Sequence, residues 1–269
     1  MAAAPPARIE GDGDAVVLVH GFPLDGRMWA PQVATLRERY RVIVPDVLGF
    51  GPAGPGAAGD RDGAPAGAMA RCADQLASLL DGLGVSRAVL CGCSMGGYIA
   101  FAFLRRHPGR LRGLVLLDTR AAPDSDQILR RRRRQLDRLA AEGVGFLPEE
   151  LLPSYVGETS HATRPAVVEA VTRLILEQDP RAVAGALRAM AARPDSTHLL
   201  PTVAVPTLVV VGEEDILTPP ATARAMAAAI PAAKFAEIPY AGHLPSLEVP
   251  DGLDRELQQF LSELGQTTP

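Results

Sequence analysis

Residues 91–100 read CGCSMGGYIA and place two thiols and one hydroxyl group among glycines. Only Ser94 has a glycine two positions before it and another two positions after it, so Gly92 and Gly96 complete the frame G-x-S-x-G. A sharp turn from a strand into a helix needs residues without bulk at both of these shoulders. The frame therefore predicts that Ser94 is a nucleophile and that the two neighbouring cysteines are not.

The chain contains an odd number of cysteines, Cys72, Cys91 and Cys93, and their spacing is not that of a metal site. Cys91 and Cys93 would point to the same side of one strand, which is poor geometry for a disulfide. We therefore expect free thiols and a reducing, cytoplasmic location. Cys93 is interpreted as a small strand residue rather than a redox or nucleophilic one.

Length and composition suit one α/β domain with an insertion, since the chain has 269 residues and 47% of them are apolar. A net charge of -4 and a pI near 5.8 argue against nucleic acid or an anionic membrane as the main partner. The first residues show neither the cationic start nor the apolar segment of a secretory signal. No apolar run reaches the length of about 18 residues that a membrane span needs. We expect a monomer or a homodimer.

Short apolar runs alternate with helical patterns in the first and last parts of the chain. Near-continuous apolarity over the length of a strand is typical of buried parallel strands. The Gly-, Pro- and Ala-rich segment 49–67 is long for a connection, and we expect a mobile surface loop there. The runs that we expect to form strands are 15–21, 40–47, 87–94, 111–118, 205–212 and 234–240. This alternation predicts a mostly parallel sheet with helices on both faces.

Residues 120–198 interrupt the alternation with helical patterns alone. Four segments in this block have apolar residues at helical spacing. An all-helical block inside an alternating chain suggests a parallel sheet that carries a helical cap. We therefore divide the chain into an α/β core, residues 1–119 and 199–269, and a cap of four helices, residues 120–198.

Five consecutive arginines occupy residues 130–134 in the first predicted cap helix. Such a basic run can indicate a nucleic-acid or targeting site. Consecutive residues spread around the whole circumference of a helix, however, so these arginines cannot form one basic face. We expect a solvated cap helix, and we expect no run of cationic residues from the cap in the substrate pocket.

A serine hydroxyl becomes a strong nucleophile only when a general base takes its proton, and that base needs a third group to fix its tautomer. In sheets of this order the groups follow along the chain as serine, acid and histidine. His243 alone follows the last predicted strand and precedes the last predicted helix, so we expect it to be the base. We expect His20 to brace the loop after the first strand. The remaining histidines are expected to end a helix, face solvent or pack in the cap: His107, His161 and His198.

The acid is expected at Asp215, in the segment VVVGEEDILTPP at 209–220. This aspartate lies just beyond a predicted strand end, where side chains converge on the crevice of an α/β sheet. Glu213 and Glu214 are local alternatives. Asp118, beyond the preceding strand, is the more distant alternative.

Two backbone N–H groups suffice to hold the oxyanion of a tetrahedral intermediate. Met95 starts the helix after the serine, where the helix dipole favours negative charge. Phe22 is expected to supply the second N–H group, because Gly21 lets its loop turn toward the serine. We expect His20 and Gly21 to lie at the substrate pocket. Trp29 either lines an acyl pocket or packs in the core.

Five blocks of the sequence, in this order and at these separations, resemble the α/β-hydrolase superfamily: HGFPLDGRMW, DVLGFG, GCSMGG, GEEDILTPP and AGHLPSLEVP. They are most similar to its small, cofactor-free branch of esterases, enol-lactonases and haloperoxidase-like enzymes. The resemblance covers nearly the whole core, and the cap matches only in being helical. Many relatives carry arginine where this chain has Leu48, so any contact that this arginine makes is absent here.

The resemblance implies a serine hydrolase that cleaves a short- to medium-chain carboxylic ester or lactone through an acyl-enzyme, without an organic cofactor or a metal. A roofed pocket favours acyl chains of about C2 to C6 over emulsified triglycerides. Perhydrolysis, in which peroxide replaces water, is an alternative at the same site. A ligand receptor with an intact triad and negligible turnover is the alternative from another class, since fold alone does not settle function.

Overall fold

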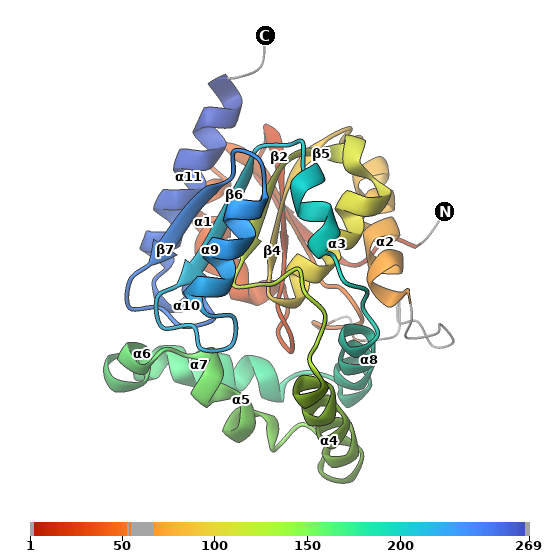
Figure 1. Ribbon diagram of the computed structural model, residues 1–269, viewed down its shortest axis with the longest axis vertical. Coiled ribbons are helices and arrows are strands. Elements are labelled where there is room, and N and C mark those ends of the chain that lie inside the picture. The colour runs from red at the N-terminus through yellow and green to blue at the C-terminus, as the bar shows by residue number, and fades with distance from the viewer. Residues whose placement is uncertain (1–2, 53, 55–66, 267–269) are drawn as a thin grey trace.

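The computed structural model describes residues 3–52, 54 and 67–266, and within them one seven-stranded sheet forms the centre of the molecule (Figure 1). The strand order is β1-β3-β2-β4-β5-β6-β7, and every pairing except that of β1 with β3 is parallel. The strands are β1 (Ala7–Glu10), β2 (Asp14–Val19), β3 (Tyr40–Pro45), β4 (Ala88–Cys93), β5 (Leu111–Leu117), β6 (Thr207–Gly212) and β7 (Lys234–Ile238). The prediction of a mostly parallel sheet is confirmed. Most of the predicted loop 49–67 lies outside the described residues.

One strand, β1, is absent from the sequence prediction. It lies at the edge of the sheet and pairs antiparallel with β3 alone. Its residues are half-buried or exposed, and Ile9 is 39% exposed. An edge strand of this kind carries no run of apolar residues, so the apolar pattern that revealed the other strands could not reveal it.

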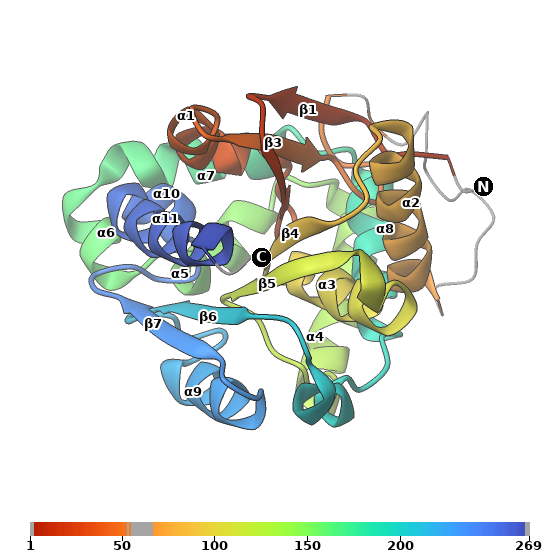
Figure 2. The same cartoon turned by 90° about the horizontal axis from the view of Figure 1, so that it is seen from above.

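Helices cover both faces of the sheet, as predicted (Figure 2). One face carries α1 (Ala30–Leu36) and α11 (Pro250–Gln266), and the short α10 (Pro245–Glu248) leads into α11. The other face carries α2 (Ala68–Gly82), α3 (Met95–Arg106) and α9 (Pro220–Ala229). Every residue of β4 and β6 is buried between these layers, so the ends of these two strands are held rigidly.

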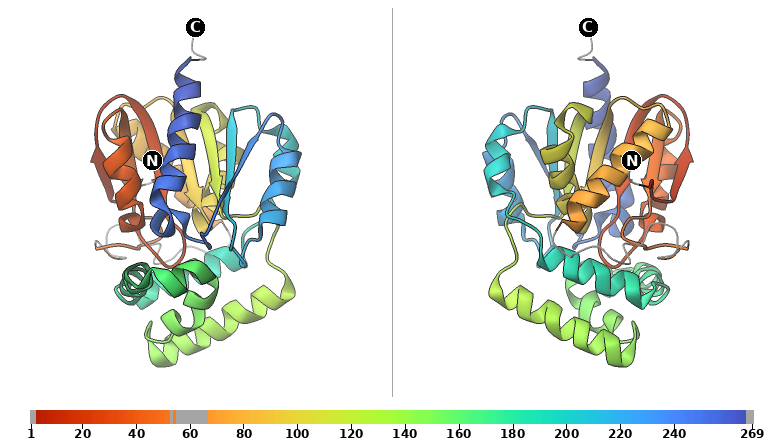
Figure 3. Two further views of the ribbon diagram at one scale, coloured as in Figure 1. Left: turned by 90° about the vertical axis from the view of Figure 1, so that its left-hand side faces the viewer. Right: turned by 90° about the vertical axis from the view of Figure 1, so that its right-hand side faces the viewer.

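The remaining helices gather beyond one end of the sheet (Figure 3). They are α4 (Asp126–Glu142), α5 (Leu147–Tyr155), α6 (Glu158–Thr163), α7 (Pro165–Leu176) and α8 (Pro180–Ala191). Segments that follow β3, β6 and β7 bond to them, through Gly51 with Gln178, Glu214 with Thr159, and His243 with Tyr155. These helices therefore lie over the carboxyl ends of the strands.

The described part of this block contains five helices, and the prediction of four is wrong. The additional helix is α6, which has only six residues and ends just before Pro165 begins α7. Six residues are less than two turns, too few for an apolar stripe to appear in the sequence. Within the residues that the structure describes, no helix has the length and apolarity needed to cross a bilayer.

The chain enters and leaves the helical block at one buried ion-pair cluster. The Asp124 side chain is fully buried and pairs with Arg132 of α4 at 2.6 Å and with Arg193, just after α8, at 2.7 Å. Burial alone would raise the pKa of this carboxyl, but its bonds and charges with both arginines outweigh burial and lower the pKa below its ordinary value. The two crossings between core and helical block are thereby tied together.

Candidate active site

Ser94 lies at a tight turn between β4 and α3 with φ 52° and ψ −110°. Few residues other than glycine adopt such a positive φ, so the turn is strained. A Cβ atom on Gly92 would lie 2.3 Å from the carbonyl oxygen of Gly96, and one on Gly96 would lie 2.3 Å from that of Val19. Both shoulders of the turn therefore have room only for hydrogen, which is the physical meaning of the G-x-S-x-G frame.

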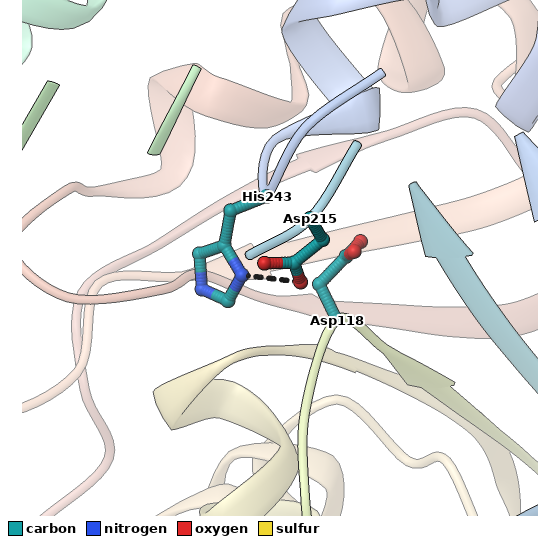
Figure 4. A group of neighbouring side chains, drawn as sticks. All are labelled: Asp118, Asp215 and His243. Carbon is teal, nitrogen blue, oxygen red and sulfur yellow. Dashed lines mark hydrogen bonds and ion pairs between the residues drawn. The ribbon is translucent and has the colours of Figure 1, made fainter. Parts of the chain in front are cut away.

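The structure brings Ser94, His243 and Asp215 together from three separate loops. The Ser94 hydroxyl lies 2.8 Å from Nε2 of His243, and Nδ1 of His243 lies 2.8 Å from a carboxylate oxygen of Asp215 (Figure 4). His243 is completely buried, Asp215 is 2% exposed and Ser94 is 8% exposed. Because Nδ1 faces a carboxylate, it carries the proton, and Nε2 is left free to accept one from the serine.

The carboxylate of Asp215 is held in its charged form. It accepts hydrogen bonds from the N–H groups of Leu217 and Thr218, at 2.7 and 3.0 Å, and from the Thr218 hydroxyl. Burial would raise the pKa of this carboxyl, but the charge and hydrogen bond of His243 and the bonds from Thr218 outweigh burial. The pKa therefore lies well below its ordinary value.

The three alternative acids from the sequence, Asp118, Glu213 and Glu214, have hydrogen-bond partners other than His243. Asp118 also ends beside this pair, with one oxygen accepting the N–H of Gly212 at 2.8 Å, whereas its other oxygen is buried without a hydrogen-bond partner among the described residues. Burial and the nearby charge of Asp215 raise the pKa of Asp118 well above its ordinary value, so this acid is neutral. Glu213 accepts from the N–H of Tyr240 and Glu214 from that of Thr159. Among the described acids, only Asp215 bonds to the His243 ring.

Figure 4 shows these two aspartates and His243 side by side. One possible ligand atom from each of the three residues lies within 4.8 Å of the other two. Three such side chains are a possible ligand set for a metal ion. Two of the three, however, are already bonded to each other through Nδ1 of His243. The cluster therefore has the chemistry of a hydrogen-bonded acid–base pair rather than of a metal site.

The thiols of Cys91 and Cys93 are fully buried in β4. Burial raises the pKa of both thiols, and for Cys93 the nearby carboxyl groups of Asp118 and Asp215 add to the effect. A thiol attacks only as its thiolate. Burial in β4 therefore disfavours the thiolate form of both cysteines.

The loop after β2 approaches the serine closely. A Cβ atom on Gly21 would lie 3.4 Å from Cβ of Ser94. The N–H group of Phe22, in this loop, donates no hydrogen bond to any described residue. The N–H group of Met95 is the first of α3 and has no partner within the helix. Two backbone N–H groups in the segments next to the serine thus have no acceptor among the described residues.

His20 and Trp29 are completely buried. Nδ1 of His20 lies 3.0 Å from the carbonyl oxygen of Gly21, and its Nε2 accepts the N–H of Val47 at 3.0 Å. Burial lowers the pKa of His20, so the ring is neutral and can play both roles at once. His20 thus connects the Gly21 loop to the segment after β3, and Trp29 packs within the core cluster.

Sequence reasoning missed Glu248, which organises the loop that carries His243. Its buried carboxylate accepts the N–H groups of Gly242 and Leu244, both at 3.0 Å, and that of Gly157 in the helical block at 2.8 Å. In the sequence, Glu248 is only a charged residue at the start of the last predicted helix. Two donors lie within six residues of Glu248, but Gly157 lies 91 residues away, so no local pattern could have identified the link to the helical block.

Comparison with known proteins identifies the fold family of this chain. The sequence profile of the alpha/beta hydrolase fold matches residues 14–250, which include every strand except β1. This family match agrees with the observed fold, which is a mostly parallel sheet with Ser94 at the turn between β4 and α3. The chain therefore belongs to the α/β-hydrolase fold family, and its class is that of the hydrolases.

Three individual proteins are similar to this chain along most of its length. A thermophilic esterase from Thermogutta terrifontis is 44% identical, with a TM-score of 0.90 over 96% of this chain and 93% of that one. The enol-lactonase from Burkholderia xenovorans LB400 is 28% identical, with a TM-score of 0.85 over 96% of each chain. The protein named "Putative carbamate hydrolase RutD" from Pantoea ananatis is 29% identical over 93% of this chain and 89% of its own length.

Proposed function

We propose that the protein is a serine hydrolase that cleaves short- to medium-chain carboxylic esters or lactones. In this proposal Ser94 is the nucleophile, His243 the general base and acid, and Asp215 the group that orients His243. The N–H groups of Phe22 and Met95 hold the oxyanion. The observation that supports it most directly is the unbroken hydrogen-bond chain from the Ser94 hydroxyl through His243 to Asp215, with 2.8 Å at each step.

The reaction proceeds in two halves. The Ser94 oxygen attacks the carbonyl carbon while its proton passes to Nε2 of His243, and the alcohol leaves with that proton. Water then attacks the acyl-enzyme, giving one proton to His243, and the acid departs as Ser94 recovers its proton. The negative oxygen formed in each half needs two hydrogen-bond donors, and the N–H groups of Phe22 and Met95 suit this role.

The acyl preference follows from the enclosure of the site. Ser94 is 8% exposed beneath the helical block, so its hydroxyl does not face an open surface. An enclosed site favours substrates that fit a pocket, with acyl chains of about C2 to C6 as an order of magnitude. The names of the esterase and the enol-lactonase similar to this chain are consistent with ester and lactone substrates.

The test is hydrolysis of p-nitrophenyl esters from C2 to C16, together with simple lactones and a p-nitrophenyl carbamate. Ser94→Ala should lower kcat on the C4 ester by about 10⁴-fold or more. Cys93→Ala, which removes a buried thiol next to the nucleophile, is the matched control and should retain most activity. A fluorophosphonate should add one mass increment, on the peptide that contains Ser94.

Two outcomes would contradict the proposal. Activity that survives Ser94→Ala but disappears in Cys93→Ala would transfer the nucleophile to the thiol. Tight ligand binding with ester turnover close to the uncatalysed rate would identify a receptor on this fold. A preference for the C16 ester, or activation by a lipid interface, would contradict the acyl-chain assignment but not the nucleophile.

A further inference from the structure

A second concavity lies beside the catalytic residues but does not include them. It is a cavity of about 460 Å³ between α2, α3, the segment after β5 and the end of α8. None of Ser94, Asp215 and His243 is among its lining residues. Its volume falls within the range of roughly 300–1,000 Å³ typical of sites for small molecules.

One part of the cavity wall is apolar and built from rigid elements. These side chains are buried, come from α2, α3 and α8, and are Met69, Tyr98, Phe101, Ala102 and Ala189. Arg193 lies flat over the Tyr98 ring, with 3.9 Å from Cζ to the ring centroid, and so fixes its orientation. This part of the wall is therefore apolar and held in place by its packing.

The cavity also has four arginines, and their partners differ. Arg106 is paired with Asp74 at 2.7 Å, and Arg193 is paired with Asp124 at 2.7 Å. Both of these arginines therefore already have a carboxylate partner, although Arg193 shares Asp124 with Arg132. The net charge of the cavity therefore depends on the partners of Arg105 and Arg120.

Arg105 bonds only to neutral groups, the Ser196 hydroxyl at 3.1 Å and the backbone carbonyl of Asp195 at 3.5 Å. Arg120 is half-buried and makes no hydrogen bond or ion pair with any described residue, and its Nε is fully buried. Asp195 is the single carboxylate among the described lining residues, and it accepts the N–H of Thr197 at 2.8 Å. Arg105 and Arg120 are thus two cations at the cavity without an ion-pair partner among the described residues.

A guanidinium group keeps its charge and offers five N–H donors in a fixed fork. Leaving such a group partly buried without a partner is unfavourable, and a carboxylate matches its geometry with two parallel hydrogen bonds. Tyr98, beside it in the cavity, also makes no hydrogen bond to a described residue and can donate one through its hydroxyl. The cavity therefore combines an anion receptor with an apolar wall.

We propose that this cavity binds a small organic acid, with Arg120 paired to its carboxylate and its hydrocarbon part against Tyr98 and Phe101. The site is separate from Ser94, so it does not bear on the sequence expectation that the cap supplies no run of cationic residues to the substrate pocket. Five consecutive arginines drew attention to 130–134, whereas the cavity is lined by Arg120 and Arg193, seventy-three positions apart in the sequence. The inference goes beyond the proposed function, since binding here requires no turnover.

The experiment is calorimetric titration of the full-length protein with 4-phenylbutyrate and with the neutral 4-phenylbutyramide. The carboxylate should bind with one site per chain, and the amide at least about tenfold more weakly, the factor expected when a charged hydrogen bond is lost. Arg120→Gln should weaken 4-phenylbutyrate binding by a similar factor. Arg188→Gln removes an exposed charge of α8 that does not line the cavity, and should leave the affinity unchanged.

Blocking Ser94 with a fluorophosphonate separates this site from the catalytic one. Binding of 4-phenylbutyrate should persist in the blocked protein with the same affinity and the same dependence on Arg120. Loss of binding on blocking would show that the acid occupies the catalytic site, and the proposal would then be wrong. Equal affinities for acid and amide, no binding of the acid, or full affinity in Arg120→Gln would also overturn it. The blocking step needs a reactive Ser94, whereas the comparison of acid with amide and of Arg120→Gln with Arg188→Gln does not depend on whether the protein hydrolyses esters.

Discussion

Asp215 and Asp118 are buried carboxyl groups at the ends of neighbouring strands, and hydrogen bonding separates their chemistry. Asp215 receives bonds from two backbone N–H groups, the Thr218 hydroxyl and His243. Asp118 receives one, from Gly212. A carboxylate is stabilised by each donor, and a second carboxylate nearby is penalised, so one acid is charged and the other is neutral.

At the same scale we predict unequal effects of removing these two acids. Asp215→Asn should lower kcat by about 10⁴-fold with the fold intact, because an amide leaves His243 in the wrong tautomer. Asp118→Asn replaces a neutral acid with a neutral amide that can still accept from Gly212, and should cost less than about tenfold. Steady-state kinetics, with circular dichroism to check folding, measures both. A larger loss in Asp118→Asn would move the catalytic acid to the end of β5.

His20 leads to a second prediction at the residue scale, which concerns how the free energy of unfolding depends on pH. Burial lowers the folded pKa of His20 from the ordinary 6.5, so below that pH the unfolded chain binds a proton that the folded chain does not. The free energy of unfolding should therefore fall as pH drops from about 6.5, by at most about 1.4 kcal/mol per pH unit from this group. Urea denaturation between pH 5 and 8 measures the slope.

The control for this effect is a comparison of slopes rather than of absolute stabilities. His20→Gln should reduce the slope below pH 6.5 even though it also weakens the loop. His161→Gln changes an exposed histidine and should leave the slope unaltered. An unchanged slope in His20→Gln would show that another group takes up the proton.

At the scale of elements, the junction of β4 with α3 depends on backbones in direct contact. Gly92→Ala would place a Cβ 2.3 Å from the Gly96 carbonyl, and backbone cannot yield as a flexible side chain can. We therefore expect severe destabilisation, with little soluble folded protein. Gly185→Ala, within α8 and with no atom within 4 Å of its Cβ, should instead stabilise the protein by about 0.5–1 kcal/mol. A Gly92→Ala protein with the thermal stability of the wild type would disprove the close contact.

At the scale of the whole molecule, the helical block is joined to the core by two chain crossings that share Asp124. Asp124→Asn would leave the buried Arg193, whose side chain is 4% exposed, without its carboxylate. Breaking a buried pair by removing one partner costs about 3 kcal/mol or more. We expect that loss in chemical denaturation, with looser packing of the block and a raised KM for esters. Glu142→Gln breaks an exposed ion pair with Arg138 within α4 and should change little.

Much of the fold was predictable because its signals are local in the chain. Buried parallel strands need continuous apolar runs, and this requirement marked the five inner strands β2 to β6 of the described sheet. The edge strand β7 was also predicted, although most of its residues are only half-buried. The glycines around Ser94 are equally local, since the shoulders of one turn are two residues away. The elements that escaped prediction are β1 and α6, which are too short or too exposed to carry an apolar pattern.

The sequence by itself determined the fold class and the three residues to place at the candidate site, through patterns a few residues long and their order along the chain. Only the tertiary structure decided which acid is charged, because that depends on donors from Gly212, Thr218 and His243 meeting in one buried place. It also decided that Glu248 holds the His243 loop and that Arg120 lacks a partner among the described residues. Protonation states and ion pairs depend on distances and burial in space, and the spacing of residues along a chain does not give these quantities.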